Sequence, residues 1–258
     1  MSRAGRPGVS LLDGIDLVVF DKDGTLIDFD AMWAPWIVEL AARLERTTGL
    51  PLAERLFAEL GFEPVAGRTI SGGPLAVLPM GILRGAVSNV VVRAGAGAAA
   101  AAAAVDAAWF VPDPVTTARP LADLPRLFAA LHGAGCRIAV ATSDDHEPAA
   151  RTLASLGLAD LVDLLVGADD GLARKPAPDM VLRAAAAVDV PAARTAVVGD
   201  SLADLEMGRA AGAGRVIGVL SGVSSRDDLE PFADAVVSKS RFWPTGGCRR
   251  SAAGTGRC

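Results

Sequence analysis

The amino-acid sequence predicts an α/β protein in which a parallel sheet carries helices on both faces and a mostly helical domain is inserted into the chain. Three observations lead to this prediction. Short apolar runs alternate with helical segments in the second half of the chain, an apolar run at 17–20 stands near the start, and the stretch between them has helical periodicity. Short apolar strands that alternate with helices indicate a parallel sheet buried on both faces.

The elements of the sheet are read from apolar runs and from the residues that end them. The first strand is the run Leu17–Phe20. Further strands are predicted over 137–141, 161–166, 195–198, 216–219 and 235–237, with helices over 147–156, 178–188 and 202–211. Pro178 stands near a helix N-terminus, where its missing N–H costs nothing. These elements assign residues 10–27 and 121–238 to one discontinuous α/β core domain.

The segment 28–120 has a different pattern, and we predict a helical cap domain inserted after the first strand. Apolar residues recur at helical spacing in two consecutive helices. They are Trp33, Trp36, Ile37, Leu40 and Leu44 in the first helix, and Leu52, Leu56 and Leu60 in the second. A looser glycine- and proline-rich stretch over 67–85 then precedes an alanine-rich helix within 94–111. The tryptophans are expected to serve packing rather than ligand binding.

Composition excludes several classes of protein. The net charge is −5 and the pI about 5.1, which argues against a nucleic-acid partner bound through a broad basic surface. The most apolar long segment, 94–111, is mostly alanine and glycine and too weakly hydrophobic for a membrane span. The first residues lack the apolar run of a signal peptide. Nothing in the sequence indicates an oligomeric state.

The cysteines and the C-terminal residues complete the composition. Cys136, Cys248 and Cys258 form no CxxC pair, so neither a disulfide framework nor a zinc site is indicated, and a cytoplasmic location is expected. Residues 239–258 carry no periodicity, and glycine, arginine and cysteine are prominent among them. We predict that this tail is disordered.

Polar residues stand directly after several predicted strands. Asp21 and Asp23 follow the first strand, and Gly24 and Thr25 then turn the chain. The other groups are Thr142 and Ser143 after the strand 137–141, Lys175 before a helix, and Gly199, Asp200, Ser201 and Asp204 after the strand 195–198. Since ligands bind at the carboxyl ends of the strands in open α/β sheets, these groups are expected to converge at one edge. Each has an ordinary structural explanation when taken alone, such as a turn or a helix cap, but together they indicate a site.

Their chemistry suits phosphoryl transfer. Asp21 can attack phosphorus and form an acyl-phosphate, and Asp23 can protonate the leaving alcohol and then deprotonate water. Asp21 and Asp200 are hard oxygen ligands suited to Mg²⁺. Thr142 can donate its hydroxyl to a phosphoryl oxygen, and Lys175 can neutralise the phosphoryl group. Asp21, Asp23, Thr142 and Lys175 are therefore the expected catalytic residues. The expected phosphate-binding residues are Gly24, Thr25, Thr142, Ser143 and Lys175; Asp204 and Ser201 are supporting residues, Asp204 holding Lys175 or a metal-bound water.

The four motifs resemble those of the haloacid dehalogenase superfamily over residues 14–238. The resemblance implies a Rossmann-like parallel sheet, a helical cap after the first strand, Asp21 as nucleophile, Asp23 as acid and base, and Mg²⁺ held by Asp21, the Asp23 carbonyl and Asp200. Many relatives have a small apolar residue where Lys22 stands and asparagine where Ser143 stands. Lys22 adds charge beside the nucleophile, although alternation along a strand points its side chain away.

The resemblance favours a phosphatase like the phosphoglycolate phosphatases, acting on a small-molecule phosphate ester. Asp23 argues against dehalogenation, and a lysine-free segment 28–120 argues against phosphonate cleavage. Two alternatives stay open: a phosphomutase acting on a sugar phosphate, since the insertion holds several arginines, and a catalytically silent relative that binds a phosphorylated ligand or a protein. Specificity is expected to lie in the insertion, whose sequence does not identify the substrate.

Overall fold

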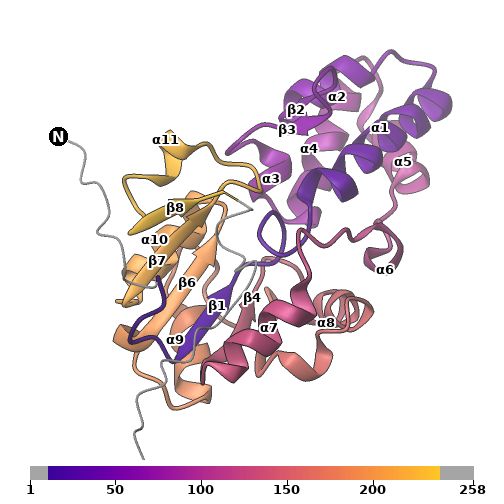
Figure 1. Cartoon of the computed structure of the whole chain (residues 1–258). Coiled ribbons are helices and arrows are strands. Elements are labelled where there is room, and N and C mark those ends of the chain that lie inside the picture. Colours follow the sequence, from indigo (N-terminus) through magenta and orange to yellow (C-terminus); the bar gives the residue numbers. More distant parts are fainter. Residues whose placement is uncertain (1–10, 239–258) are drawn as a thin grey trace, which may run out of the picture.

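The computed structural model describes residues 11–238, which build a six-stranded parallel sheet and, beyond one end of it, a group of helices (Figure 1). The strand order is β5-β4-β1-β6-β7-β8. The strands are β1 (Leu17–Phe20), β4 (Arg137–Ala141), β5 (Leu164–Val166), β6 (Thr195–Gly199), β7 (Arg215–Val219) and β8 (Ala235–Val237). The predicted α/β class with a parallel sheet is confirmed, and the first strand of the chain lies in the middle of the sheet.

Strand β1 pairs in parallel with β4 on one side and β6 on the other, and helices packed on the sheet bury both of its faces. Side chains alternate along it. Val18 and Phe20 pack toward α7 (Leu124–Gly133), where the ring centroids of Phe20 and Phe128 lie 5.3 Å apart. Leu17 and Val19 join the cluster on the opposite face. This alternation explains why the run before Asp21 is apolar throughout.

Helices cover both faces of the sheet. One face carries α7 and α8 (His146–Ser155), and the other carries α9 (Asp179–Ala187) and α10 (Leu202–Ala210). The short helix α11 (Arg226–Leu229) and two 3-10 turns, η1 (Ala159–Leu161) and η2 (Ala192–Arg194), complete this part. The predicted strand over 161–166 is shorter in the structure, because η1 takes up residue 161 and the next two residues connect it to β5.

The segment between β1 and α7 is mostly helical, as expected. It contains α1 (Phe29–Thr48), α2 (Ala53–Leu60), β2 (Phe62–Glu63), β3 (Arg68–Thr69), α3 (Pro74–Val77), α4 (Met80–Arg93), α5 (Ala98–Ala108) and α6 (Pro114–Thr117). The Asp28 carboxylate accepts a hydrogen bond from Ala31 N at 3.1 Å and caps α1. Trp36 is 2% exposed and its indole N–H donates to Phe110 O, so this tryptophan serves packing.

Two features of this segment differ from the sequence-based expectation. The stretch 67–85 was expected to be loose, but its last residues, from Met80 on, form the start of α4. In addition, β2 and β3 form a small antiparallel pair. Glycine costs about 1 kcal/mol inside a helix, and α4 contains Gly81 and Gly85. Packing overrides this cost, because α4 buries four apolar side chains at helical spacing against its neighbours. They are Leu83, Val87, Val90 and Val91.

The two chain crossings between the sheet and the inserted helices lie side by side. Asp28 N donates to Arg119 O at 2.8 Å, and Leu121 N donates to Leu26 O at 2.9 Å. These bonds tie the outgoing and returning chains into a short ribbon. The division into a core domain and a cap domain stays a prediction.

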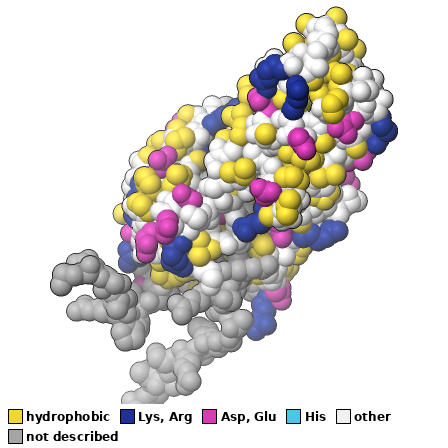
Figure 2. Space-filling model, turned by 90° about the horizontal axis from the view of Figure 1, so that it is seen from above, with side chains coloured by type: hydrophobic (Ala, Val, Ile, Leu, Met, Phe, Trp, Pro, Cys, Tyr) yellow, Lys and Arg dark blue, Asp and Glu magenta, His cyan; other side chains and the backbone are white. Residues whose placement is uncertain are grey.

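No helix within residues 11–238 combines the length and the apolar character needed to cross a membrane. On the face seen in Figure 2, basic side chains are scattered among acidic and apolar ones rather than gathered into one field. The expected disorder of residues 239–258 concerns a segment outside the described residues.

Candidate active site

Neighbouring strands bring the predicted site residues to one edge of the sheet. Asp21 follows β1, Thr142 follows β4 and Asp200 follows β6, and β1 lies between the other two strands. Lys175 comes from the connection between β5 and α9, and Asp204 from the first turn of α10. Parallel strands end at the same edge, so the topology alone places these groups close together.

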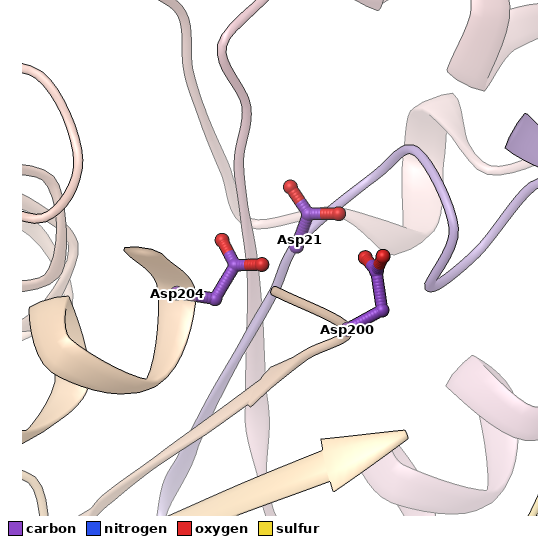
Figure 3. Close-up of side chains that lie close together, drawn as sticks. All are labelled: Asp21, Asp200 and Asp204. Atoms are coloured by element: carbon purple, nitrogen blue, oxygen red, sulfur yellow. The ribbon is translucent and has the colours of Figure 1, made fainter. Parts of the chain in front are cut away.

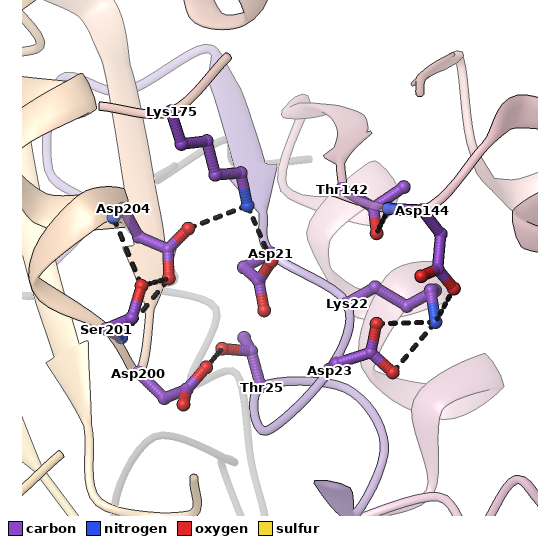
Figure 4. A network of polar contacts seen from close by, with 10 residues as sticks. All are labelled: Asp21, Lys22, Asp23, Thr25, Thr142, Asp144, Lys175, Asp200, Ser201 and Asp204. Carbon is purple, nitrogen blue, oxygen red and sulfur yellow. Dashed lines mark hydrogen bonds and ion pairs between the residues drawn. The ribbon is translucent and has the colours of Figure 1, made fainter. Parts of the chain in front are cut away.

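Lys175 bridges two carboxylates at the centre of this edge (Figure 4). Its Nζ lies 2.6 Å from Asp21 Oδ1 and 2.7 Å from Asp204 Oδ1. The side chains are almost closed off from water, at 5% exposure for Lys175, 10% for Asp21 and 2% for Asp204. Burial disfavours the charged amine, but Asp204 and Asp21 hold the pKa of Lys175 above its ordinary value. The lysine is therefore a fixed positive charge beside Asp21.

Asp204 is itself held in place. Its Oδ2 accepts a hydrogen bond from Ser201 Oγ at 2.6 Å and another from Ser201 N at 3.2 Å. Ser201 Oγ in turn accepts from Asp204 N, which completes a capping box at the start of α10. Of the two roles expected for Asp204, the structure has it holding Lys175.

Asp200 lies beside this bridge and has no bonded cation among the described residues. Its Oδ1 accepts from Thr25 Oγ1 at 3.1 Å and its Oδ2 accepts from Val223 N at 2.9 Å. The residue is 2% exposed. Asp21, Asp200 and Asp204 each offer a carboxylate oxygen within 4.8 Å of the others (Figure 3). Three buried carboxylates with one ammonium leave negative charge uncompensated, and this donor set fits a hard divalent cation.

Glycines allow the chain to close around these carboxylates. A Cβ on Gly222 would lie 1.9 Å from Asp200 Oδ2, and a Cβ on Gly24 would lie 2.5 Å from the same atom. A Cβ on Gly199 would lie 2.3 Å from Asp204 Cβ. Gly24 also has φ of +86°, a conformation that favours glycine. Only glycine fits at these positions.

Asp23 belongs to a second ionic group, formed with Lys22 and Asp144. Lys22 Nζ lies 2.7 Å from Asp23 Oδ2, 2.8 Å from Asp23 Oδ1 and 3.0 Å from Asp144 Oδ2. The Lys22 side chain has no exposed surface. It points away from Asp21, as alternation predicts, but it binds the next carboxylate along the chain. Asp144, two residues beyond Thr142, was not recognised from the sequence at all.

Burial and neighbouring charges raise the pKa of three aspartates. Desolvation raises the pKa of Asp21 well above its ordinary value, and the Asp204 carboxylate adds to this while Lys175 opposes it. Desolvation and Asp204 also raise the pKa of Asp200 to about 7. Burial raises the pKa of Asp23 although Lys22 acts to lower it. A divalent cation in the Asp21–Asp200–Asp204 cluster would favour the ionised forms of its ligands.

The remaining predicted residues lie in different places. Ser143 lines the cavity described below, together with Asp21, Asp23 and Lys175. Thr142 and Thr25 are fully or almost fully buried and do not line it. Thr142 Oγ1 accepts from Asp144 N at 3.2 Å. Gly24 O accepts from Ser221 Oγ at 2.7 Å. Direct phosphate binding by Gly24, Thr25 and Thr142 stays a prediction, and Thr25 is seen to support Asp200.

The metal ligands predicted were Asp21, Asp200 and the backbone carbonyl of Asp23. Two of these, Asp21 and Asp200, belong to the carboxylate cluster, whereas the Asp23 side chain is engaged by Lys22. Asp204 supplies the third carboxylate of the cluster, but one of its oxygens binds Lys175 and the other binds Ser201. Asp21 and Asp200 are therefore the side chains best placed to hold a cation.

A cavity of about 530 Å³ opens over these groups. One wall carries the aspartates and Lys175, and the other is formed by residues 75–83 with Phe29 and Trp33 from α1. Trp33 is thus both part of the aromatic packing and part of the cavity wall. The volume suits a small-molecule ligand, and the arrangement presents the Asp21 carboxylate, the Asp23 carboxyl group and the Lys175 ammonium to it.

Comparison with known proteins agrees with this fold. Residues 15–212 match the haloacid dehalogenase-like hydrolases. The chain belongs to this family. The Probable phosphatase IndB of Dickeya dadantii is 33% identical over 221 residues, which span 86% of this chain and 88% of that protein. The Phosphoglycolate phosphatase of Aquifex aeolicus is 26% identical over 220 residues, which span 84% and 90% of the two chains. The family match and these phosphatase relatives together indicate that the chain is a phosphatase-type hydrolase.

Solved structures share the fold. A HAD family hydrolase from Deinococcus radiodurans, solved with bound phosphate and sodium, has a TM-score of 0.59 at 20% identity and covers 89% of this chain and 93% of its own. A Thermotoga maritima protein with a provisional β-phosphoglucomutase assignment has a TM-score of 0.62 at 19% identity, covering 89% and 97%. At these identities the likeness concerns the fold alone.

Proposed function

We propose that this protein is a Mg²⁺-dependent phosphatase that hydrolyses a small-molecule phosphate monoester through an aspartyl-phosphate on Asp21. The observation that carries the proposal is the bridge from Lys175 to Asp21 and Asp204, beside the unneutralised Asp200 carboxylate and at the base of a cavity. Lys175 Nζ engages one oxygen of Asp21, which orients the carboxylate and leaves its other oxygen for attack. Buried, fixed charges of this kind are effective because they need no reorganisation during the reaction.

The reaction divides into two steps at phosphorus. In the first, an Asp21 oxygen forms a bond to phosphorus, the ester P–O bond breaks, and Asp23 gives a proton to the departing alcohol. In the second, Asp23 takes a proton from water as the water oxygen bonds to phosphorus, and the bond to Asp21 breaks. Inorganic phosphate leaves and both aspartates return to their starting forms. Lys175 neutralises charge on the phosphoryl group in both steps.

Lys22 and Asp144 position the acid and base. Lys22 contacts both oxygens of Asp23, which fixes the carboxyl group beside the cavity. The raised pKa of Asp23 makes the protonated form accessible for the first step, while Lys22 keeps the ionised form accessible for the second. General acid–base catalysis of this kind contributes ~10² to 10⁴-fold.

Asp21 and Asp200 would hold the cation, with the Asp23 carbonyl as the third protein ligand that the family resemblance implies. A bound Mg²⁺ would neutralise the phosphoryl oxygens and the carboxylates around them. Its fit rests on the donor set, since the cluster has three buried carboxylates and a single ammonium partner among the described residues.

The inserted helices act as a cap domain in this proposal, and the sheet with its covering helices is the core domain. Residues 75–83 form the wall that faces the catalytic groups. Closure of the cap would exclude water during attack by Asp21. The paired crossings at 26–28 and 119–121 are where such a motion would pivot.

The alternatives receive no specific support. A phosphomutase would use basic residues of the insertion at the site, but Arg43, Arg84 and Arg93 are ion-paired within the insertion and none of these lines the cavity. The resemblance to a phosphoglucomutase structure concerns the fold only. A silent binding protein is disfavoured because every motif residue is present, and the catalytic test below separates it from an enzyme.

The test is hydrolysis of p-nitrophenyl phosphate with Mg²⁺, with EDTA, and by the variant Asp21→Asn. We expect turnover that EDTA abolishes, and no turnover in the variant. The matched control is Asp160→Asn, which changes an exposed aspartate in η1 and is expected to keep full activity. If Asp21→Asn hydrolyses the ester at the wild-type rate, Asp21 is not the nucleophile. A phosphorylated intermediate trapped on Asp21 would support it directly.

A further inference from the structure

The cavity has two unlike walls, and the wall away from the catalytic groups is apolar. It is built from residues 75–83, the sequence LAVLPMGIL, with Phe29 and Trp33. Leu75 and Leu83 are almost fully buried and anchor the segment in the insertion. Val77 and Ile82 are 52% and 57% exposed although they are large and apolar. Exposed apolar surface that lines a ligand cavity indicates what part of a ligand contacts it.

The cavity is poor in cations that could receive a second anionic group. Six aspartates line it, and its only lining cations within residues 11–238 are Lys175 and Arg174. Lys175 is committed to Asp21 and Asp204 and to the phosphoryl group. Arg174 is exposed and comes from the core side, next to Lys175. The apolar wall itself supplies no charged side chain.

Three arginines of the insertion bind other partners. Arg84, which lies in α4 close to the apolar wall, is ion-paired with Asp106 and lies over the ring of Trp109. Arg43 binds Glu39 and stacks on Phe110, and Arg93 binds Glu59. A carboxylate on a leaving group that lies along the wall 75–83 would therefore face apolar side chains, with Arg174 on the opposite, core side of the cavity. Leaving such a charge without a partner is costly.

We infer that the preferred substrate is a phosphate monoester of an uncharged alcohol with apolar surface, and not a carboxylated ester such as phosphoglycolate. The inference rests on the proposed phosphatase function and concerns its substrate class. The phosphoryl group lies at Asp21 and Lys175, and the carbon skeleton of the alcohol lies against residues 75–83. The names of the phosphoglycolate phosphatases related to this chain therefore do not describe its substrate.

The first experiment compares kcat/KM for phosphoglycolate, ethyl phosphate, butyl phosphate and phenyl phosphate with Mg²⁺ present. Ethyl phosphate matches phosphoglycolate except for the carboxylate. We expect ethyl phosphate to exceed phosphoglycolate at least tenfold, and butyl phosphate to exceed ethyl phosphate by about fourfold for each added methylene that the wall buries. Phosphoglycolate turned over as well as butyl phosphate would overturn the inference while leaving the phosphatase proposal intact.

The second experiment places a charge on the apolar wall. Ile82→Arg is expected to raise the ratio of phosphoglycolate to butyl phosphate kcat/KM at least tenfold. The control Ile70→Arg changes another half-exposed isoleucine of the insertion, outside the cavity lining, and is expected to leave the ratio unchanged. Val77→Arg repeats the test at a second position if Ile82→Arg is poorly folded. If neither Ile82→Arg nor Val77→Arg changes the ratio of phosphoglycolate to butyl phosphate kcat/KM, the inference is contradicted. It is also contradicted if the wild-type protein prefers phosphoglycolate and Arg174→Gln removes that preference.

Failure of the two proposals can be told apart. If no ester, including p-nitrophenyl phosphate, is hydrolysed by folded protein with Mg²⁺, the phosphatase proposal fails and the substrate inference fails with it. If p-nitrophenyl phosphate is hydrolysed and the carboxylated ester is preferred, only the substrate inference fails.

Discussion

Replacing Lys22 by methionine tests whether its ion pairs hold Asp23. Methionine has a similar length and no charge, so Lys22→Met leaves Asp23 and Asp144 as two carboxylates without their common cation. Removing one partner of a buried ion pair typically costs 3–5 kcal/mol. Asp23 and Asp144 keep 18% and 34% of their side chains exposed, so water relieves part of this cost. We therefore expect a loss of about 3 kcal/mol in the free energy of unfolding.

This loss can be measured as a change in melting temperature. For a chain of this size, about 1 kcal/mol corresponds to roughly 2–4 °C, so Lys22→Met should lower the Tm by roughly 6–12 °C. The control Arg194→Met removes the cation of an exposed pair with Asp16 and should cost less than about 1 kcal/mol. The double variant Lys22→Met with Asp144→Asn removes the repulsion between the two carboxylates and should recover part of the stability.

The same variant should change catalysis in a way that a purely structural role would not. We expect kcat to fall by ~10²-fold, the lower end of the range for general acid–base catalysis, because Asp23 is still present but no longer held. Loss of the neighbouring cation raises the pKa of Asp23 further, so the alkaline limb of kcat/KM should move to higher pH. A variant with an unchanged Tm and an unchanged pH profile would refute this account of Lys22.

Three further predictions concern the carboxylate cluster. The pKa of Asp200 is about 7 in the folded protein and near 4 when unfolded, so the metal-free protein should lose stability as pH rises between these values. The increase in Tm on adding Mg²⁺ should therefore be larger at pH 8 than at pH 5.5, and equal increases would contradict this. Gly222→Ala should abolish turnover and weaken Mg²⁺ binding in a titration, because the new Cβ would overlap Asp200. The control Gly85→Ala has open space around its Cβ in α4 and should raise the free energy of unfolding by about 0.5–1 kcal/mol in a denaturant titration. Lys175→Met should lower kcat by ~10² to 10³-fold in the p-nitrophenyl phosphate assay, and retention of activity would exclude Lys175 from the mechanism.

The sequence predicts the core well because its signals are local and agree with one another. The run Leu17–Phe20 is apolar on both faces, which is how a central parallel strand appears, and the structure places it between β4 and β6. The fold then brings together Asp21, Lys175 and Asp200 without any further assumption. In the insertion, helix α4 was missed because Gly81 and Gly85 weaken the local signal, and its stability comes from packing that no local pattern records.

The ionic group of Lys22, Asp23 and Asp144 could not be predicted for a related reason. Alternation along a strand tells which way a side chain leaves the backbone, and it correctly turns Lys22 away from Asp21. It does not tell what lies there. Asp144 reaches Lys22 because β4 pairs with β1 in one particular register, and Asp144 follows the end of β4. The sequence does hold one signal of this ionic group: Lys22 stands between two site aspartates in a chain that has only three lysines.

The central position of β1 has a consequence for biosynthesis. Asp21 leaves the ribosome early, yet its partner Lys175 is 154 residues further along the chain, and Thr25 is separated from Asp200 by 175 residues. A nascent chain that ends before β6 lacks Asp200, the proposed second cation ligand, and Asp204, the second carboxylate bound by Lys175. In such a chain β1 also lacks one of its two neighbouring strands. The proposed nucleophile is therefore translated long before its partners, and on this proposal phosphatase activity begins only when nearly the whole of the described chain has been made.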